Sequence, residues 1–468
     1  MDTQAPDLEK FDALIIGAGQ AAEPLAIALG EAGWKTAVIE RKQVGGSCVN
    51  FGCTPTKAMA ASARVAYLAR RAGDYGVRTG PVEVELASVM QRRNMIVSQF
   101  RDSVQEALEG ADNVELIFGH AAFEGPHALA VRLNAGGSRR LAARHIFINT
   151  GTRAAIPSTP GLDRVPFLDA SSIQELHELP DHLLVIGGSS IGLEFGQMFR
   201  RFGSRVSIIQ RGRQLMGRED PDVAEAVHKI LLEDRLDVYL NAEVRQVGQE
   251  HGDIVLTLQL PAGPLRLHGS HVLVATGRIP NSDDLNLAAA GVGADAKGYI
   301  TVNERLETSV PGVYALGDVK GGPAFTHIAY DDYRVLKANL LAAGNATTSG
   351  RPVPYTVFID PQLGRVGLTE NEAKETGRRL LLARLPVSRV ARALETGETR
   401  GFIKAVVDAE TGFILGCAVL APEGGELMTI LQLAMAGGIP YARLRDAIFA
   451  HPTLAESLNG LFAAPEPL

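Results

Sequence analysis

The sequence predicts an α/β protein that contains one strand–glycine turn–helix–strand unit twice and ends in a separate α+β domain. The first copy is FDALIIGAGQAAEPLAIALGEAGWKTAVIE at residues 11–40, and the second is LLVIGGSSIGLEFGQMFRRFGSRVSIIQ at residues 183–210. Each copy has the length and glycine spacing of a βαβ unit that binds a dinucleotide. Two copies of this Rossmann-like architecture predict two bound dinucleotides.

Length, charge and cysteine content limit the class of protein. A chain of 468 residues exceeds what one hydrophobic core supports, so several domains are expected. A net charge of −7 argues against nucleic acid as a partner. We find no apolar run that could span a membrane, and the start passes from a short acidic leader into a strand without a signal-peptide pattern, so we expect a cytoplasmic protein. With only three cysteines, a structural disulfide framework is not expected.

Changes of pattern along the chain indicate the domain boundaries. Short alternating strands at residues 110–143 and 236–273 predict a β-meander in each dinucleotide-binding domain, and VYALGD at residues 313–318 returns to the first of them. From residue 352 the chain changes to antiparallel strands with helices. The predicted domains are 1–150 with 276–350 for the first dinucleotide, 151–275 for the second, and 351–468 for the C-terminal interface domain.

The first glycine turn has the residues that a dinucleotide phosphate needs. Gly17 allows a tight turn, Gly19 lets the backbone approach a pyrophosphate, and small Ala22 lets the helix pack closely on the strand. Glu40 ends the second strand, where it can bond ribose hydroxyl groups.

Two cysteines follow this unit directly. Cys48 and Cys53 can close a short disulfide loop if the chain bends at Gly52. Their position after the ribose strand predicts that they lie near the reactive ring of the cofactor, where a helix N-terminus and nearby positive charge would stabilise a thiolate. Two alternatives are a metal clip, for which third and fourth ligands are missing nearby, and two unrelated core cysteines.

The segment GGSCVNFGCTPTK, residues 45–57, resembles the redox-active motif of the class I flavoprotein pyridine nucleotide-disulfide oxidoreductases. The resemblance implies FAD in the first unit and a nicotinamide cofactor in the second. It also implies a redox-active disulfide in which Cys48 is the interchange thiol and Cys53 the charge-transfer thiol, with Lys57 beside the flavin and paired with Glu194. The residues expected at FAD are Gly17, Gly19, Ala22, Glu40, Gly46, Lys57, Thr150, Gly151, Gly317, Asp318 and Ala329.

The second unit differs from the first at two points. Ser189 stands where the middle glycine is usual, and neutral Gln210 ends the second strand, with Arg211 and Arg213 after it. A neutral residue beside guanidinium groups suits a 2′-phosphate, so we predict NADPH over NADH; the alternative is that these arginines only cover the surface. The residues expected at the nicotinamide cofactor are Gly187, Gly188, Ser189, Gly192, Gln210, Arg211, Arg213 and Gly277.

The C-terminal segment HPTLAE resembles the acid–base dyad of the same family, which implies a homodimer with an active site shared between subunits. His451 would exchange protons with the interchange thiol, and Glu456 would orient it. Cys417 lies in an apolar strand and is expected in the core. Residues 330–341 are expected to serve packing and the solvated surface.

Within the family, the segments GDVKGGPAFTHIAYDDYR and HPTLAESLNGLF resemble the bacterial mercuric-reductase-like subgroup that includes a reactive-chlorine-resistance flavoprotein linked to Cu(II) reduction. Glutathione reductase and dihydrolipoamide dehydrogenase are alternatives, and the latter is typically NAD-dependent. A mercuric reductase usually has a vicinal cysteine pair near its C-terminus, whereas Cys417 is the last cysteine here. We therefore expect a small disulfide or a metal ion as the electron acceptor and no resident metal site. The more distant alternative is a flavin-binding protein without turnover.

Overall fold

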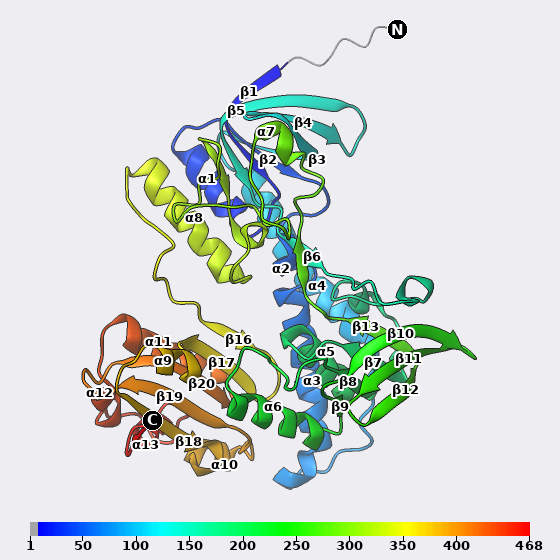
Figure 1. The fold of residues 1–468 in the computed structure, drawn as a ribbon, viewed down its shortest axis with the longest axis vertical. Coiled ribbons are helices and arrows are strands. Elements are labelled where there is room, and N and C mark those ends of the chain that lie inside the picture. The colour runs from blue at the N-terminus through cyan, green and yellow to red at the C-terminus, as the bar shows by residue number, and fades with distance from the viewer. Residues whose placement is uncertain (1–7) are drawn as a thin grey trace. The chain divides into compact units, whose positions relative to one another are not determined.

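The computed structural model describes residues 8–468, which form two compact units (Figure 1). The first unit contains the chain up to Ala58, Met90–Ala155 and Gly277–Arg351, and the second contains Met59–Val89, Ile156–Thr276 and Pro352–Leu468. Most of the expected acidic leader lies outside the described residues. The predicted mixed α/β class is confirmed. The division into four segments stays a prediction.

The first unit is built on a mixed sheet. Its parallel part has the order β3, β2, β1, β5 and β15, while β4 pairs antiparallel with β3 and β5 to form a meander. A short antiparallel pair, β6 with β14, belongs to the same unit. The strands are β1 (Leu8–Ile16), β2 (Thr36–Glu40), β3 (Val114–Gly125), β4 (Ala128–Leu133), β5 (Ser138–Ile148), β6 (Thr152–Ala154), β14 (Arg278–Pro280) and β15 (Val313–Ala315).

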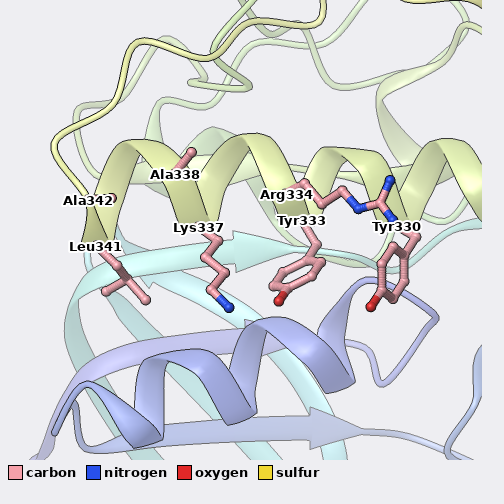
Figure 2. A pocket seen from close by; sticks show the side chains of 7 residues that line it. All are labelled: Tyr330, Tyr333, Arg334, Lys337, Ala338, Leu341 and Ala342. Atoms are coloured by element: carbon pink, nitrogen blue, oxygen red, sulfur yellow. The ribbon is translucent and has the colours of Figure 1, made fainter.

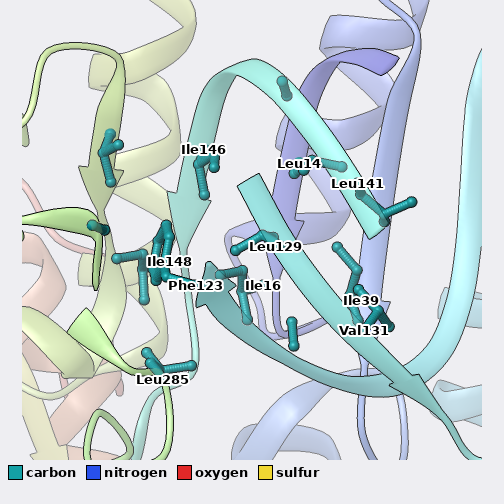
Figure 3. Close-up of a cluster of buried hydrophobic side chains, with 14 of the residues drawn as sticks. Leu14, Ile16, Ile39, Phe123, Leu129, Val131, Leu141, Ile146, Ile148 and Leu285 are labelled. Atoms are coloured by element: carbon teal, nitrogen blue, oxygen red, sulfur yellow. The ribbon is translucent and has the colours of Figure 1, made fainter. Parts of the chain in front are cut away.

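The alternation of side chains along β1 produces two cores. Leu14 and Ile16 point into one cluster with Phe123 and Ile148 (Figure 3), whereas Ile15 belongs to the cluster on the other face. Helices α1 and α8 pack beside each other and contribute to this second cluster (Figure 1). The helices that begin in this unit are α1 (Ala22–Glu31), α2 (Gly46–Asn50), α3 (Cys53–Arg70), α7 (Leu287–Ala290) and α8 (Thr326–Leu341). Helix α4 (Leu86–Glu109) begins in the second unit and continues into the first.

The second unit contains the second nucleotide-binding fold. Its sheet is wholly parallel with the order β13, β7, β8 and β9, and β10, β11 and β12 form the predicted antiparallel meander. The elements are β7 (His182–Ile186), α5 (Ser190–Phe202), β8 (Arg205–Ile209), α6 (Pro221–Glu233), β9 (Asp237–Tyr239), β10 (Glu243–Glu250), β11 (Asp253–Leu260), β12 (Gly263–Gly269) and β13 (His271–Val274).

An antiparallel sheet in the order β16, β17, β20, β19, β18 and β21 completes the second unit. Helix α11 packs on β17 and β20, and Cys417 is buried in β20, as expected. Over residues 8–468, none of the helices is both long and apolar enough to cross a membrane. The elements are β16 (Tyr355–Val357), β17 (Gln362–Gly367), α9 (Glu370–Glu375), β18 (Leu380–Pro386), α10 (Ala391–Glu395), β19 (Phe402–Asp408), β20 (Ile414–Ala421), α11 (Gly424–Ala436), α12 (Tyr441–Arg445), α13 (Ser457–Leu461) and β21 (Glu466–Pro467).

Candidate active site

The first glycine turn is packed too closely against neighbouring backbone to admit a side chain at Gly17 or on the adjacent Gly46. Gly17 has φ +95°, and a Cβ atom there would lie 2.7 Å from the Asn149 carbonyl oxygen. Gly46 packs against the same turn, because a Cβ atom on it would lie 2.8 Å from the Cα atom of Gly19. Helix α1 begins at Ala22, directly after the turn. The close backbone packing and the helix N-terminus fit the pyrophosphate of a dinucleotide.

Glu40 lies at the end of β2 and is buried. One carboxylate oxygen accepts a hydrogen bond from the Ala18 backbone N–H at 2.9 Å, and the other accepts one from the Lys42 N–H at 2.7 Å. The structure thus joins the glycine turn to the residue that was predicted to bond the ribose.

A second part of the first unit holds the predicted Gly317–Asp318 turn. The Gly317 N–H donates to the Asp332 carboxylate at 2.8 Å, and the Asp318 carboxylate accepts from the Thr152 hydroxyl at 2.9 Å. Thr150 and Gly151 follow the end of β5, where the Thr150 hydroxyl donates to the Asn281 carbonyl at 2.7 Å.

The two cysteines occupy consecutive helices of the first unit. Cys48 lies in α2 and Cys53 begins α3, and both are free thiols that hydrogen-bond to each other. The bend between them depends on Gly52, where a Cβ atom would lie 2.8 Å from the Ser47 carbonyl oxygen. The Cys53 sulfur lies 3.4 Å from the hydroxyl of Thr326, the first residue of α8. Both thiols are therefore close to the N-terminus of a sixteen-residue helix.

The pair holds one negative charge more easily than two. The hydrogen bond to Cys53 is the largest cause that raises the pKa of the Cys48 thiol, followed by burial and by the charge of Cys53 itself. The raised pKa favours the protonated form of Cys48 beside the exposed Cys53.

Lys57 and Glu194 belong to different units. Lys57 lies one turn after Cys53 in α3 of the first unit. Glu194 lies in α5 of the second unit, where its carboxylate accepts a hydrogen bond from the Phe358 N–H at 2.8 Å. Their predicted pairing stays a prediction.

The second glycine turn is packed as tightly as the first. Gly187 has φ +123°, and a Cβ atom on it would lie 2.3 Å from the Ala275 carbonyl oxygen. At Gly192 a Cβ atom would lie 2.0 Å from the Gly187 carbonyl oxygen, so the helix approaches the turn closely. Ser189 precedes α5 in an extended conformation. The turn fits a second dinucleotide phosphate.

Gln210 ends this strand region, and the exposed Arg211 and Arg213 follow it. Its side-chain oxygen accepts a hydrogen bond from the Gly188 N–H at 3.2 Å. Gly277 has φ +136° and opens the segment by which the chain re-enters the first unit.

His451 and Glu456 form a dyad in the second unit. The His451 Nδ1 atom lies 2.9 Å from Oε2 of Glu456, and the histidine side chain is 72% exposed. Because the carboxylate can only accept, Nδ1 carries the proton in this contact and Nε2 is left to exchange protons. Cys48 belongs to the first unit, and the predicted cooperation of the dyad with it stays a prediction.

Comparison with known proteins identifies the family. Residues 11–332 match the family model described as pyridine nucleotide-disulphide oxidoreductase, and residues 353–461 match the dimerisation domain of the same family. The chain belongs to the pyridine nucleotide-disulfide oxidoreductases.

Three relatives show how closely the chain follows this family. RclA of Escherichia coli (strain K12) is 36% identical over 97% of this chain and 99% of its own length. A mercuric reductase of Lysinibacillus sphaericus is 35% identical over 96% of this chain and 82% of its own length. A solved structure described as the Cu(II) complex of the HOCl-induced flavoprotein disulfide reductase RclA from Escherichia coli has a TM-score of 0.89, with 36% identity over 97% of this chain and 99% of that chain.

Family membership gives the general activity. The protein is an FAD-dependent oxidoreductase that uses NAD(P)H, and the Cys48–Cys53 pair is compatible with the disulfide chemistry of the family. The dimerisation domain indicates a homodimer.

The structure also shows a residue of the site that the sequence analysis misassigned. Asp332 lies within residues 330–341, which were expected to serve packing and the surface, yet it is fully buried and pairs with Lys320 at 3.3 Å and Arg351 at 2.8 Å. The rest of that expectation holds: buried Tyr333 packs in the core, and together with the exposed Tyr330 and Lys337 it lines an open hollow on the side of α8 that faces α1 (Figure 2). Helical periodicity can place Asp332 on the buried face of α8. Its partners Lys320 and Arg351 come from segments outside this helix, so the sequence pattern does not reveal them.

Two contacts, one of Thr326 and one of Asn149, were missed as well. Thr326 contacts the Cys53 thiol, and the Asn149 side chain donates to the Gly17 carbonyl at 3.3 Å. Each lies next to a predicted site residue in space and far from it in sequence, so spacing alone carries no signal for either one.

Proposed function

We propose that the protein is an NADPH-preferring reductase that passes electrons through FAD and the Cys48–Cys53 pair to a small disulfide. The observation that carries this proposal is the hydrogen-bonded thiol pair beside Thr326 at the start of α8. A pair that holds one charge suits a reductase, because one thiol can stay ionised while the other awaits a substrate.

The glycine turns at Gly17 and Gly187 would hold FAD and NADPH, and when bound the two cofactors would supply the hydride chemistry that converts the Cys48–Cys53 disulfide to the dithiol. The chain's part is to hold the thiols. We assign Cys53 as the thiol beside the flavin and Cys48 as the interchange thiol, because the raised pKa of Cys48 favours its protonated form and leaves the charge of the pair to Cys53. Lys57 and Glu194 are proposed as the ion pair next to the flavin, as in the family.

The dithiol then reduces the substrate in two exchanges. The Cys48 thiol gives its proton to His451 of the partner subunit and attacks one sulfur of the substrate disulfide, which forms a mixed disulfide and releases one substrate thiolate. The Cys53 thiolate attacks the Cys48 sulfur, which restores the Cys48–Cys53 disulfide and releases the second thiolate. Each leaving thiolate takes a proton, which we assign to His451 of the partner subunit.

The exposure of the His451–Glu456 dyad supports proton transfer between the two subunits of a homodimer. His451 is 72% exposed, and nearby Ile448 is fully exposed, so this face of the C-terminal domain presents both a proton donor and apolar surface. We infer that the dimerisation domain presents the dyad to the partner's dithiol, so that the isolated subunit has an incomplete active site.

A metal ion is the second candidate acceptor, because relatives include mercuric reductases and an RclA structure that is a Cu(II) complex. The chain offers few thiols for such an ion. Cys417 is 1% exposed, so Cys48 and Cys53 would have to bind the metal alone. We therefore expect weakly complexed ions to react and excess thiol to suppress the reaction.

Cysteine variants test the assigned roles. Cys53→Ser should abolish the long-wavelength absorbance between the thiolate and the flavin in the reduced protein, whereas Cys48→Ser should keep or enhance it. Absorbance spectra of the FAD-loaded variants check this. Cys417→Ser, which changes the buried third cysteine, serves as the control, and identical spectra for the Cys48 and Cys53 variants would reject the roles.

A histidine variant separates the two acceptors. With a disulfide acceptor, His451→Ala should lower turnover by roughly 10²- to 10⁴-fold, the usual contribution of a general acid. With Hg(II) or Cu(II), the same variant should lose little, because a metal ion needs no proton. The measurement is turnover with NADPH against lipoamide, oxidised glutathione, Hg(II) and Cu(II). His268→Ala, which alters an exposed histidine of β12, is the control.

The cofactor preference rests on the exposed Arg211 and Arg213 beside neutral Gln210. A wild-type kcat/KM that favours NADH would contradict it. The domain assignment, with FAD bound by 1–150 and 276–350 and the nicotinamide cofactor by 151–275, belongs to the same proposal. The cytoplasmic location stays a prediction.

A further inference from the structure

A loop of the second unit, residues 211–219, carries the arginines that we assign to the 2′-phosphate; we call it the arginine loop. Its two sides differ. Arg211 and Arg213 are exposed and form no ion pair with any carboxylate of residues 8–468, while Leu215 and Met216 of the same loop are buried. The arginine loop therefore exposes the charges of Arg211 and Arg213 and buries its apolar side chains. The position of these charges depends on the contacts that fix the loop.

Side-chain hydrogen bonds run through this loop from the glycine turn. The Gly188 N–H donates to the Gln210 side-chain oxygen at 3.2 Å, and the Gln210 amide donates to the Gln214 carbonyl at 3.1 Å. The Gln214 amide in turn donates to the Glu219 carbonyl at 3.0 Å. The Met216 N–H closes the loop onto the Gly188 carbonyl at 2.8 Å.

The far end of the arginine loop is held by the C-terminal sheet. Glu219 is buried, and its carboxylate accepts a hydrogen bond from the Tyr355 hydroxyl in β16. Arg365 in β17 lies 3.8 Å from the same carboxylate. The next residue, Asp220, pairs with buried Lys404 of β19 at 2.9 Å. The domain that forms the predicted subunit interface thus contacts the end of the loop.

We infer that Gln214, Glu219 and Tyr355 are positioning residues for the 2′-phosphate of NADPH. They touch no part of the cofactor themselves. Their hydrogen-bond path fixes the arginine loop between the glycine turn and the C-terminal sheet, and so sets where Arg211 and Arg213 present their charges. The inference rests on the proposed NADPH preference and extends it, since it makes the C-terminal domain a determinant of cofactor choice.

The path predicts an effect on one cofactor and not on the other. NADH has no 2′-phosphate, so it does not use the charges on the arginine loop. Tyr355→Phe keeps the ring and removes only the hydroxyl that Glu219 accepts. It should raise the KM for NADPH by roughly 3- to 10-fold, the change that loss of one hydrogen bond gives, and leave kcat/KM for NADH unchanged.

The experiment compares the FAD-loaded wild type with Tyr355→Phe and Gln214→Met, using kcat and KM for both cofactors and the inhibition constant of 2′,5′-ADP. Gln214→Met removes the amide in the middle of the path and leaves the buried Glu219 contact in place, so it tests the inference even if Tyr355→Phe folds poorly. Glu219→Gln keeps an acceptor for the Tyr355 hydroxyl and should retain selectivity. Tyr441→Phe, which removes another hydroxyl of the C-terminal domain, is the matched control.

The outcomes separate this inference from the proposed function. A wild type that does not prefer NADPH removes the basis of both. A wild type that prefers NADPH, with the NADPH-to-NADH ratio of Tyr355→Phe and Gln214→Met unchanged, overturns the inference alone. An equal loss with both cofactors in these two variants shows a purely structural role and also overturns it.

Discussion

The two glycine turns belong to the same kind of βαβ unit, yet they differ in the hydrogen bonds made by the residue at the end of the second strand. Glu40 accepts two backbone N–H groups, from Ala18 at 2.9 Å and Lys42 at 2.7 Å. Gln210 accepts one, from Gly188 at 3.2 Å, and donates to the Gln214 carbonyl at 3.1 Å. A carboxylate can only accept, whereas an amide can do both. The local backbone therefore favours an acid in the first unit and an amide in the second, in addition to any preference of the ribose.

The loops near the two sites are also held differently. In the first unit, buried Asp332 accepts the Gly317 N–H and pairs with Lys320 and Arg351. In the second unit, the arginine loop is held mainly by amide and hydroxyl groups. The first site thus depends on a buried charge that contacts the glycine turn directly, whereas in the second the amide bonds of Gln210 and Gln214 separate the turn from the buried carboxylate of Glu219, which predicts different responses to substitution and pH.

The largest expected effects come from the glycines themselves. Gly17→Ala should abolish FAD binding, because its Cβ atom would lie 2.7 Å from the Asn149 carbonyl oxygen. Gly187→Ala should keep FAD and lose reduction by NADPH, since its Cβ atom would lie 2.3 Å from the Ala275 carbonyl oxygen. Flavin absorbance of the purified variants and rapid-mixing reduction by NADPH measure the two effects.

Gly33 and Gly203 offer matched controls. Each has positive φ, at +83° and +134°, but a Cβ atom on either meets nothing within 4 Å. Alanine there should cost only the backbone strain of about 1–2 kcal/mol and leave both cofactors bound. If Gly17→Ala remained as yellow as Gly33→Ala, the first turn would not be the FAD site.

The next effect concerns the buried charge of the first unit. Asp332→Asn should destabilise the protein by about 3–5 kcal/mol, because it removes the buried charge that pairs with Lys320 and one of the two carboxylates that pair with Arg351, and it should weaken FAD binding through the weakened contact to the Gly317 N–H. Asp331→Asn is the control, since Asp331 pairs with the same Arg351 but is half-buried. Thermal unfolding and FAD release, measured on both variants, compare them; equal losses would exclude a special role for Asp332.

Local motifs, together with the family resemblance, were enough to locate the elements to which we assign the chemistry. The glycine turns at Gly17 and Gly187, the cysteine pair and the His451–Glu456 contact all depend on residues close in sequence, where backbone geometry fixes the distance. The mixed α/β fold follows from the same repeated unit, which explains why it could be predicted without a structure.

The supporting residues could not be predicted in the same way. Thr326 is 273 positions from Cys53, and Tyr355 is 136 positions from Glu219. Such contacts arise only when separate segments of one unit pack together, and many serine, threonine and tyrosine residues could fill either place. From the sequence, Gln210 was considered only as a neutral residue near the 2′-phosphate. Its amide also donates a hydrogen bond to the Gln214 carbonyl within the arginine loop.

Exchanging the two strand-end residues sharpens the comparison further. Glu40→Gln should weaken FAD binding, because the new NH₂ group would face the N–H of Ala18 or Lys42. Two donors would then meet and one of the two hydrogen bonds would be lost. Gln210→Glu combined with Arg211→Ala should move selectivity toward NADH by about 1.5–3 kcal/mol, the contribution of one charged hydrogen bond. FAD titration and the ratio of kcat/KM values measure these effects. Arg211→Ala alone separates the lost charge from the new carboxylate, and an unchanged ratio in the double variant would contradict the assignment.

The smallest expected effect is a pH dependence of stability at Glu219. Burial is the largest cause that raises its pKa above the ordinary 4.5, and Asp220 adds to this, while Arg365, the Tyr355 hydroxyl and Lys404 oppose it. Because the folded protein binds this proton more tightly than the unfolded chain does, the contribution is fully present below pH 4.5 and is lost as the pH rises through the folded-state pKa. Glu219→Gln does not titrate, so its melting temperature relative to wild type should rise over that interval. Other carboxylates titrate in both proteins and cancel in the difference. A difference that stays flat, or that falls as the pH rises, would mean that the opposing cations keep Glu219 ionised.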